Sequence, residues 1–291
     1  LLEKGSGLKL GADFKVGYSP ERINPNDSEH TFSNTAKIVS ANDGQALDEV
    51  ARVYAEVVAA DLCRASGIRV AEAAKMTENV QRSVNIALMN ELQRLFSRMG
   101  IDMGEVIDMA SSKWNFVKYR PGLGGGHCIP VDPLYLVSAA SKLGVEMPVT
   151  SSGCAVNDGM AAYVVRSLLG AMGSDGRGAR ALLMGVTYKE NIDDIRNSRI
   201  AEMVGLLERE GMSVDVTDPH ADPDKVYAMY GIRPVPALRP PYDLIVVAVA
   251  HDEYRGLDDA YFRSISRGAA LLGDIRGLYK GRIKSLGYWS L

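Results

Sequence analysis

The chain has 291 residues, of which 46% are hydrophobic and 24% are charged, an ordinary soluble globular composition with room for one large or two to three small domains. Its 33 basic and 36 acidic side chains give a net charge of −3, which argues against a general nucleic-acid-binding or anionic-membrane surface. No apolar run reaches the length of a membrane span, and three cysteines, an odd number, fit a reducing cytoplasm.

The first part of the chain has the pattern of an incomplete α/β domain. Residues 1–10 read as the middle of a helix that ends at Gly11 and has no start signal, so the chain is expected to begin inside a domain. The order strand, helix, strand that follows is typical of the closing part of an α/β domain whose opening part is missing. The expected elements are strands at 13–18, 37–40 and 61–65 and a helix from 43 to about 58.

Residues 70–99 carry apolar side chains at spacings of three and four, which predicts one long helix. Such a helix would span roughly 45 Å at 1.5 Å per residue, so it is expected to connect domains or to form a dimer interface. Lys75 and Asn79 lie four residues apart on one face. A lysine and an asparagine on a long helix are more often solvated surface residues than functional ones. A shorter helix is expected at 102–111.

A glycine-rich loop ends in Cys128, which stands beside His127. The glycines are expected to permit positive φ and to let a ligand approach the main chain. A partly exposed thiol near backbone N–H groups and a histidine favours a nucleophile, although a lone cysteine is more often a buried, inert residue. Asp132 follows four residues later. The glycines of this loop are Gly122, Gly124, Gly125 and Gly126.

Two other uses of the loop conflict with its residue types. It is not the Gly-x-Gly-x-x-Gly turn of a dinucleotide site, because His127 is the sixth residue counted from Gly122 and no clean strand precedes the loop. A metal site is not expected either, since three cysteines and four histidines include no Cys-x-x-Cys or His-x-x-x-His pair.

The last part of the chain predicts a second α/β domain after a glycine-rich linker at 170–180. Continuous apolar runs alternate with helices, which indicates a parallel sheet covered on both faces. The first strand leads into a polar segment that contains Lys189 and Arg196 instead of a glycine-rich turn. These two residues and Arg276 could meet phosphates at strand ends, although each alone is more often a surface charge. The expected helices are 135–143, 156–169 and 200–210, and the expected strands are 181–188, 213–217, 244–249 and 269–272.

Three motifs together resemble the UDP-glucose/GDP-mannose dehydrogenase family, and the resemblance covers nearly the whole chain. They are Glu72-Ala-Ala-Lys-Met-Thr-Glu-Asn79, Gly-Gly-His-Cys-Ile-Pro-Val-Asp132, and Gly185-Val-Thr-Tyr-Lys-Glu-Asn-Ile-Asp-Asp-Ile-Arg-Asn-Ser198. Two further stretches, residues 17–25 and 113–123, look most like the branch that acts on UDP-N-acetylhexosamines, the UDP-N-acetylglucosamine 6-dehydrogenases of bacterial polysaccharide synthesis.

The resemblance implies an α/β fold in three parts. Residues 1–69 would be the truncated end of an N-terminal, Rossmann-like NAD-binding domain, and residues 70–170 a central helical dimerisation domain with the catalytic cysteine loop. Residues 171–291 would form a C-terminal, Rossmann-like UDP-sugar-binding domain with a parallel sheet. The family's Gly-x-Gly-x-x-Gly domain is absent from the sequence, so the fragment alone is expected to be inactive and not to bind NAD properly. The implied assembly is a homodimer or a higher homo-oligomer.

The implied activity is an NAD-dependent four-electron oxidation of the C6 alcohol of a UDP-N-acetylhexosamine to a carboxylate. Cys128 would carry the thiohemiacetal and thioester, Lys75 and Asn79 would stabilise the oxyanion, Asp132 would assist proton transfer or hold a water, and Glu21 would act in hydrolysis. The residues matched to substrate binding are Arg22, Arg120, Gly122, Gly124, Gly125, Lys189 and Arg276, and Arg196 is matched to a position near the NAD cofactor.

Several alternatives stay open. The substrate could be UDP-glucose or UDP-N-acetylmannosamine, and the chain could be a non-catalytic module for sugar-nucleotide binding and dimerisation. A thiol hydrolase using Cys128 with His127 is weak, because adjacent residues seldom point at each other. The choice of the hydrolytic base is also open, and Lys113 and Arg120 are candidates for an arginine that some relatives contribute from a neighbouring subunit.

Overall fold

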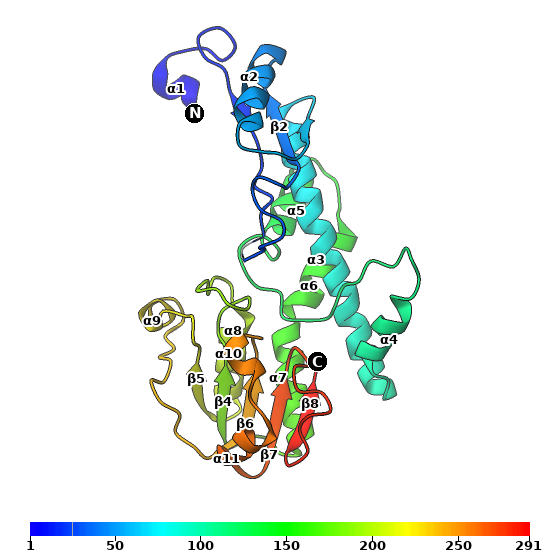
Figure 1. The fold of residues 1–291 in the computed structure, drawn as a ribbon, viewed down its shortest axis with the longest axis vertical. Helices are drawn as coiled ribbons and strands as arrows, with labels where there is room; N and C mark the ends of the chain where they lie inside the picture. Colours follow the sequence, from blue (N-terminus) through cyan, green and yellow to red (C-terminus); the bar gives the residue numbers. More distant parts are fainter. Residues whose placement is uncertain (25) are drawn as a thin grey trace. The chain divides into compact units, whose positions relative to one another are not determined.

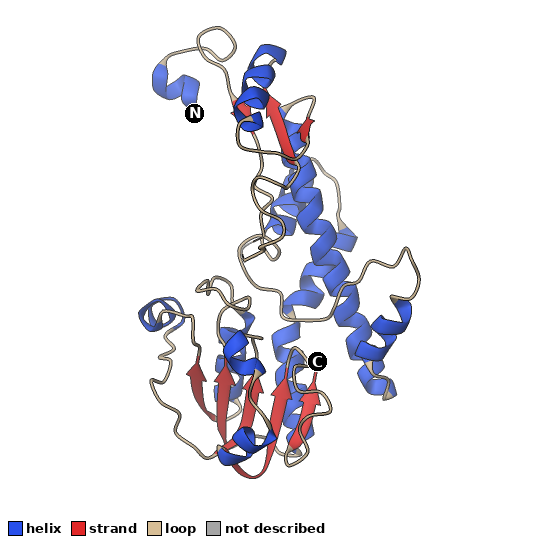
Figure 2. Cartoon of the chain, in the orientation of Figure 1, coloured by secondary structure: helices blue, strands red, loops and turns tan. Residues whose placement is uncertain are grey.

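The computed structural model describes residues 1–24 and 26–291, and the chain divides into two compact units, Leu1–Asn79 and Val80–Leu291. Figure 1 labels the helices and strands in chain order, and Figure 2 distinguishes them by colour. Pro25, the last residue of the motif at 17–25, lies outside the described residues.

The first unit contains a three-stranded sheet in the order β1-β2-β3, in which β2 pairs antiparallel with β1 and parallel with β3. The Asp43 side chain accepts a hydrogen bond from the amide of Ala46 and thereby caps the helix between β2 and β3. The predicted order of strand, helix and strand is confirmed. The elements are α1 (Leu2–Ser6), β1 (Gly17–Tyr18), β2 (Lys37–Ala41), α2 (Gly44–Ala55) and β3 (Leu62–Arg64).

The first residues differ from the expectation. The helix ends at Ser6 instead of Gly11, because Gly7 adopts a left-handed conformation with φ of 75° and terminates it. Gly11 is left-handed as well, with φ of 88°, and the turn there leaves only two residues for the strand expected at 13–18.

The long helix predicted at 70–99 is confirmed as α3 (Ile68–Met99), which supplies residues to both units. The helix expected at 156–169 is instead two helices, α6 (Pro148–Asp158) and α7 (Met160–Met172), which meet at Gly159. Proline favours the first turn of a helix, so Pro148 starts α6 earlier than its apolar pattern suggests. The other helices of this part are α4 (Met103–Ala110) and α5 (Asp132–Lys142).

The second unit also contains a five-stranded sheet in the order β5-β4-β6-β7-β8, and all of its strand pairs are parallel (Figure 1). Four of these strands were predicted, whereas the short edge strand β8 was not. The elements are β4 (Arg180–Met184), α8 (Arg199–Arg209), β5 (Ser213–Thr217), α9 (Pro223–Tyr230), β6 (Tyr242–Val247), α10 (Asp252–Arg255), α11 (Asp259–Ser264), β7 (Ser266–Asp274) and β8 (Gly287–Ser290).

Side chains cover both faces of this sheet, as the continuous apolar runs predicted. Leu182 and Leu183 are neighbours in β4, are both fully buried, and belong to different cores because successive strand residues face opposite sides. Leu183 shares its core with Leu168 of α7 and Leu207 of α8, whereas Leu182 shares the other with Phe262 of α11. The predicted α/β fold with a Rossmann-like parallel sheet and one long helix is therefore confirmed.

The parallel strands bring several loops to one edge of the sheet. The segments that follow β4, β5, β6 and β7 all leave from the carboxyl ends of their strands, where α/β proteins usually bind ligands. Among the described helices, none combines the length and the apolar composition that a membrane crossing requires.

Candidate functional site

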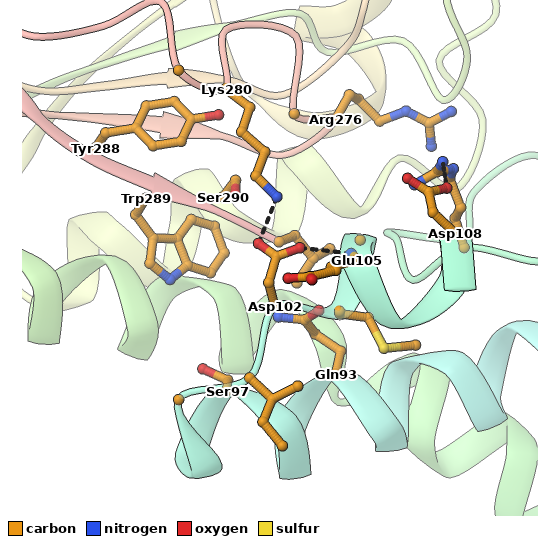
Figure 3. A pocket seen from close by; sticks show the side chains of 18 of the residues that line it. Gln93, Ser97, Asp102, Glu105, Asp108, Arg276, Lys280, Tyr288, Trp289 and Ser290 are labelled. Atoms are coloured by element: carbon orange, nitrogen blue, oxygen red, sulfur yellow. Dashed lines mark hydrogen bonds and ion pairs between the residues drawn. The ribbon is translucent and has the colours of Figure 1, made fainter. Parts of the chain in front are cut away.

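A cleft of about 780 Å³ lies between the loop after β7, strand β8 and the ends of α3 and α4 (Figure 3). Lys280 reaches across it to Asp102, with 2.5 Å between Nζ and Oδ2, and this hydrogen bond is the main reason why the pKa of Asp102 lies below its ordinary value. Trp289 and Arg276 line the same cleft. Gln93 is 6% exposed, and among the described residues its amide oxygen has no hydrogen-bond partner, so a ligand in the cleft could supply one.

Two of the cations predicted to bind substrate line this cleft, and a third lies in a recess that shares Arg276 with it. Arg120 and Arg276 line both the cleft and an adjoining cavity of about 270 Å³. Lys189 and Arg276 together line a smaller recess of about 30 Å³. Arg120 also forms a 3.5 Å ion pair with Asp108 of α4. The structure therefore brings these residues together from separate parts of the sequence, with Arg276 as the common member.

Gly122 is held by a buried asparagine of α3 that the sequence analysis did not identify. The amide nitrogen of Gly122 donates to Oδ1 of Asn90 at 2.8 Å, and Nδ2 of Asn90 donates to the carbonyl oxygen of Gly122 at 3.2 Å. Asn90 is fully buried and also donates to Asn157 of α6 at 2.9 Å. Its only sequence signal is a polar residue in the apolar stripe of a long helix.

The end of the glycine run packs against Tyr188 of the loop between β4 and α8. A Cβ atom added to Gly125 would lie 2.8 Å from Cβ of Tyr188, and one added to Gly126 would lie 3.0 Å from its ring. The amide of Gly126 donates to the carbonyl oxygen of Arg196 at 3.0 Å, and the side chain of Asn197 donates back to the Gly126 carbonyl oxygen at 2.9 Å.

The glycines of the loop are needed for a different reason from the one expected, which was positive φ. Of the four, all of which the structure describes, Gly126 alone has a positive φ, at 84°. Gly125 needs to be small because Tyr188 approaches it, whereas a Cβ atom at Gly124 would meet nothing within 4 Å. The expectation that all four glycines permit positive φ is therefore wrong for Gly122, Gly124 and Gly125.

Cys128 is a half-buried thiol that takes part in no disulfide and lies four residues before the start of α5. Its carbonyl oxygen accepts hydrogen bonds from the amides of Val131 at 3.2 Å and Asp132 at 2.9 Å. Asp132, predicted to act with the cysteine, is the first residue of α5, so the two residues share one turn at the N-terminal end of this helix. This end of a helix favours negative charge.

Arg196, the predicted cofactor contact, lies close enough to Cys128 for their charges to interact. Its guanidinium forms a two-point ion pair with Asp194, at 2.5 Å from Nη2 and 2.9 Å from Nε to the carboxylate oxygens, and this bond raises the pKa of Arg196. Burial, together with the charge of Asp194, raises the pKa of the neighbouring Tyr188 hydroxyl. The surroundings of Cys128 in this unit therefore include an ion pair and an aromatic ring.

Glu21 belongs to the first unit, where the backbone amides of the next two residues hold its carboxylate. Its Oε1 accepts hydrogen bonds from the amides of Arg22 and Ile23, both at 2.7 Å, and its Oε2 lies 3.3 Å from Nζ of Lys37. Burial raises the pKa of Glu21, but the amides and the Lys37 charge outweigh it, so the pKa lies below its ordinary value. The carboxylate is therefore ionised at neutral pH.

The remaining predicted residues of the first unit lie on or beside α3. Asn79 is 7% exposed and Lys75 is half-buried, so neither is the freely solvated surface residue that is common on long helices. Arg22 donates to the carbonyl oxygen of Ala36 at 2.6 Å and pairs with Glu78 at 2.8 Å. Whether this group meets Cys128 in one active site stays a prediction, since the two belong to different units.

His220, His251 and Glu253 bring three possible metal ligands within 4.8 Å of one another. The trio was not predicted from the sequence, since its two histidines are far apart: His220 follows β5, whereas His251 and Glu253 follow β6. Both ring nitrogens of His251 already lie at hydrogen-bond distance, Nδ1 at 3.0 Å from the amide of Asn191 and Nε2 at 3.2 Å from Asp218. We therefore assign no metal to the trio, and the expected absence of a metal stays a prediction.

The residues after β4 and β5 do not fit a dinucleotide. In such a site the turn after the first strand offers its amides to the pyrophosphate, and an acidic residue after the second strand binds the ribose. Here Asp218, directly after β5, accepts hydrogen bonds from the turn amides of Val186 at 2.6 Å and Thr187 at 3.1 Å. The two groups that would hold a dinucleotide are thus bonded to each other.

The chain is similar to known proteins in sequence and in fold. The sequence matches the UDP-glucose/GDP-mannose dehydrogenase family, with its central domain over residues 69–159 and its UDP binding domain over residues 182–281. A UDP-N-acetyl-D-glucosamine 6-dehydrogenase of Pseudomonas aeruginosa is 44% identical over 282 residues, which cover 96% of this chain and 67% of that protein. A protein of the same name from Salmonella typhi is 41% identical over 280 residues, which cover 95% of this chain and 66% of that protein.

A solved structure, that of UDP-D-ManNAc dehydrogenase from Pyrococcus horikoshii, resembles the fold with a TM-score of 0.87 at 25% identity. The match covers 99% of this chain and 67% of that one. The chain therefore spans about two thirds of the length of these relatives. The resemblance drawn from the three sequence motifs is confirmed, and the chain belongs to the UDP-glucose/GDP-mannose dehydrogenase family of nucleotide-sugar dehydrogenases.

Proposed function

We propose that this chain is part of an enzyme that oxidises the C6 alcohol of a UDP-N-acetylhexosamine to a carboxylate, with NAD as the oxidant, for the synthesis of a surface polysaccharide. The observation that carries the proposal is the group of adjoining cavities at the carboxyl edge of the parallel sheet. Arg120 and Arg276 line the cleft, and Arg276 also lines the small recess together with Lys189 and with Leu123 of the glycine-rich loop. The names of the two relatives at 44% and 41% identity support UDP-N-acetylglucosamine as the substrate.

The cleft has the chemistry that a nucleoside diphosphate requires. Guanidinium groups form paired hydrogen bonds with phosphate oxygens, and Arg276 lies where the two larger cavities and the recess meet. The ring of Trp289 and the amide of Gln93 offer the base a stacking surface and a hydrogen-bond acceptor. We therefore place the diphosphate at Arg276 and the base in the larger cleft.

The proposed chemistry uses Cys128 as a covalent nucleophile. Its thiolate attacks the C6 carbon of the aldehyde, a sulfur–carbon bond forms, and the carbonyl oxygen becomes an oxyanion that Lys75 and Asn79 stabilise. When the C–O double bond re-forms, C6 would lose its hydrogen as a hydride, with NAD as the acceptor, and a thioester would remain on Cys128. Hydrolysis of this thioester places a water oxygen on C6 and returns the electron pair to the Cys128 sulfur, with Asp132 or Glu21 accepting the proton of the water. NAD supplies a hydride acceptor for each two-electron oxidation, and Arg196 is the residue that we propose near it.

We also propose the division into domains at residues 1–69, 70–170 and 171–291, and a homodimer that forms through the central one. Leu88, Leu95 and Met99 are 48%, 52% and 59% exposed, and their spacings of seven and four residues place them on one face of α3. An apolar stripe of this kind on a long helix favours contact with a second copy.

The test of the proposed function is NADH formation by the complete gene product, assayed beside this chain with NAD and each of four substrates. These are UDP-glucose, UDP-N-acetylglucosamine, UDP-N-acetylgalactosamine and UDP-N-acetylmannosamine. We expect the complete product to form two molecules of NADH per molecule of sugar with one of the UDP-N-acetylhexosamines. We expect its Cys128→Ala variant to form no NADH. UDP-sugar binding without any turnover by the complete product would instead support a non-catalytic binding module.

A binding measurement with this chain tests the assigned cleft. We expect Arg276→Ala to weaken UDP binding by about tenfold to a hundredfold, since a hydrogen bond to a charged group contributes about 1.5–3 kcal/mol. Arg267→Ala is the matched control, because Arg267 is an exposed arginine near the start of β7 and Arg276 follows the end of the same strand. Equal affinities of the two variants for UDP in titration calorimetry would contradict the placement of the diphosphate at Arg276.

A further inference from the structure

Asp218 is a fully buried carboxylate with five hydrogen-bond partners that come from separate segments of the unit. Besides the amides of Val186 and Thr187, it accepts hydrogen bonds from the amides of His220 at 2.8 Å and Ala221 at 2.9 Å. His251 is the fifth partner. The carboxylate therefore ties the start of the loop between β4 and α8 to the segment after β5.

His251 extends this network to the middle of the same loop. The ring is fully buried, and Nδ1 accepts a hydrogen bond from the amide of Asn191 at 3.0 Å. Since Nδ1 accepts, the ring proton is assigned to Nε2, which lies 3.2 Å from Asp218 and 3.2 Å from the hydroxyl of Thr187. Asp218 and His251 together therefore hold residues 186–191 at both ends of that segment.

The opposite side of this loop holds the glycine run. Tyr188 packs against Gly125 and Gly126, and the carbonyl oxygen of Arg196 and the side chain of Asn197 hydrogen-bond to the main chain of Gly126. Cys128 follows two residues later. The loop thus has one side bonded to the buried pair and the other side bonded to the segment that carries the thiol.

We propose that Asp218 and His251 are positioning residues for Cys128: they fix the loop between β4 and α8, and this loop in turn fixes the glycine run that places the thiol. Neither residue acts on the reacting atoms in this proposal. Fixing a nucleophile within a fraction of an ångström requires supporting groups of this kind around it. The catalytic meaning of the network rests on the proposed function, whereas the mechanical link between the two loops does not.

Two substitutions of His251 separate its two bonds. Glutamine keeps a donor near the position of Nε2 for Asp218 but loses the acceptor for Asn191, and asparagine keeps an acceptor near Nδ1 but cannot reach Asp218. His220→Gln is the matched control, because the ring of His220 lies 4.8 Å from that of His251 and pairs with Glu253 outside this loop.

The measurement is amide hydrogen exchange of this chain by mass spectrometry. A lost hydrogen bond speeds local opening by about fivefold, so we expect such an increase at residues 186–191 in His251→Gln and His251→Asn. In the same two variants we expect a parallel increase in exchange at residues 124–128 and no change at residues 160–172 of α7. In His220→Gln we expect no change in any of these three segments. Faster exchange at 186–191 with unchanged exchange at 124–128 would overturn the proposal.

A milder variant covers the case in which the His251 variants no longer unfold cooperatively. Thr187→Val keeps the shape of the side chain and removes the hydroxyl near Nε2 of His251, and it should speed exchange in the same two segments. Unchanged exchange at 124–128 with faster exchange at 186–191 would again contradict the link.

Kinetics of the complete gene product then test the role in catalysis. Misplacement of the nucleophile should lower kcat about tenfold or more in the His251 variants while leaving KM for the UDP-sugar within about twofold. A raised KM with unchanged kcat would assign His251 to substrate binding and overturn its role for Cys128. If the unmodified product has no dehydrogenase activity, the proposed function fails, and the exchange result still decides whether the two loops are linked.

Discussion

The tight contact between Gly125 and Tyr188 leads to a prediction with an internal control. The substitution Gly125→Ala would place a Cβ atom 2.8 Å from Cβ of Tyr188 and 3.1 Å from the carbonyl oxygen of Asn197. Both neighbours belong to the loop between β4 and α8 and are close to the backbone, so a side-chain rotation cannot relieve the overlap. In Gly124→Ala the same methyl group would meet nothing within 4 Å.

The size of the effect follows from the distances. Carbon atoms in contact are normally about 3.5–4.0 Å apart, so the two loops would have to separate by about 0.7 Å or more at Gly125. Added atoms in a packed site typically cost about 1–3 kcal/mol. A change of this size lowers the melting temperature of a unit of about 200 residues by roughly 2–12 °C. Gly124→Ala should leave it within about 2 °C, because the new methyl group clashes with nothing and an alanine restricts the unfolded chain.

Thermal unfolding of the two variants and the unmodified chain, followed by circular dichroism, checks the stability. Because Cys128 lies three residues beyond Gly125, the alkylation rate of its thiol should also change in Gly125→Ala and stay constant in Gly124→Ala. Cys63, an exposed thiol of the first unit, is the reference in every sample. If both alanine variants melt and react alike, the packing of Tyr188 on the glycine run is not what requires a glycine at 125.

Two further predictions concern stability. Burial raises the pKa of Asp218, but hydrogen bonds from His251 and from backbone amides outweigh it and hold the pKa well below the ordinary 3.8. Because the folded state lowers this pKa, the stabilisation is complete above about pH 3.8 and is lost as the pH falls further. Between pH 6 and pH 2.5, the urea midpoint of the unmodified chain should therefore fall more steeply than that of Asp218→Asn. Parallel curves for the two proteins would refute this. In the core, Leu182→Ala should lower the free energy of unfolding by about 2–5 kcal/mol, because Leu182 is fully buried. Leu143 is 78% exposed, so Leu143→Ala should lower it by less than about 0.5 kcal/mol in urea unfolding. Similar losses for the two variants would place Leu182 outside the core.

The sheet of the second unit could be predicted because its signals are local. Strands such as β4 and β6 contain continuous apolar runs, and such runs in alternation with helices are typical of a parallel sheet. The edge strand β8 pairs with β7 alone and contains no fully buried residue, so its four residues carry no such run. The break between α6 and α7 was missed for a similar reason, since Gly159 keeps a helical conformation and the apolar pattern continues across it.

The supporting residues of the candidate site could not be predicted, because their partners are distant in sequence. Asn90 is bonded to Gly122, 32 residues away, and His251 is bonded to Asn191, 60 residues away. Nothing in the sequence near Asn90 or His251 indicates these bonds. The residues that carry chemistry stand in short motifs, but the residues that hold them in place come from wherever the fold brings a buried donor or acceptor.

Gly125 illustrates the difference between predicting that a residue is needed and predicting why. A run of glycines in a loop indicates that something approaches the main chain, and phosphate or sugar is the obvious choice beside a cysteine. At Gly125 the group that approaches is Tyr188, which the chain itself supplies from a loop some sixty residues later. The glycine then serves the position of Cys128 by letting two loops meet, and a ligand contact at this residue has to come from the remaining open side. Gly124, with open space around its Cα, is the glycine of this run where an approaching ligand still has room.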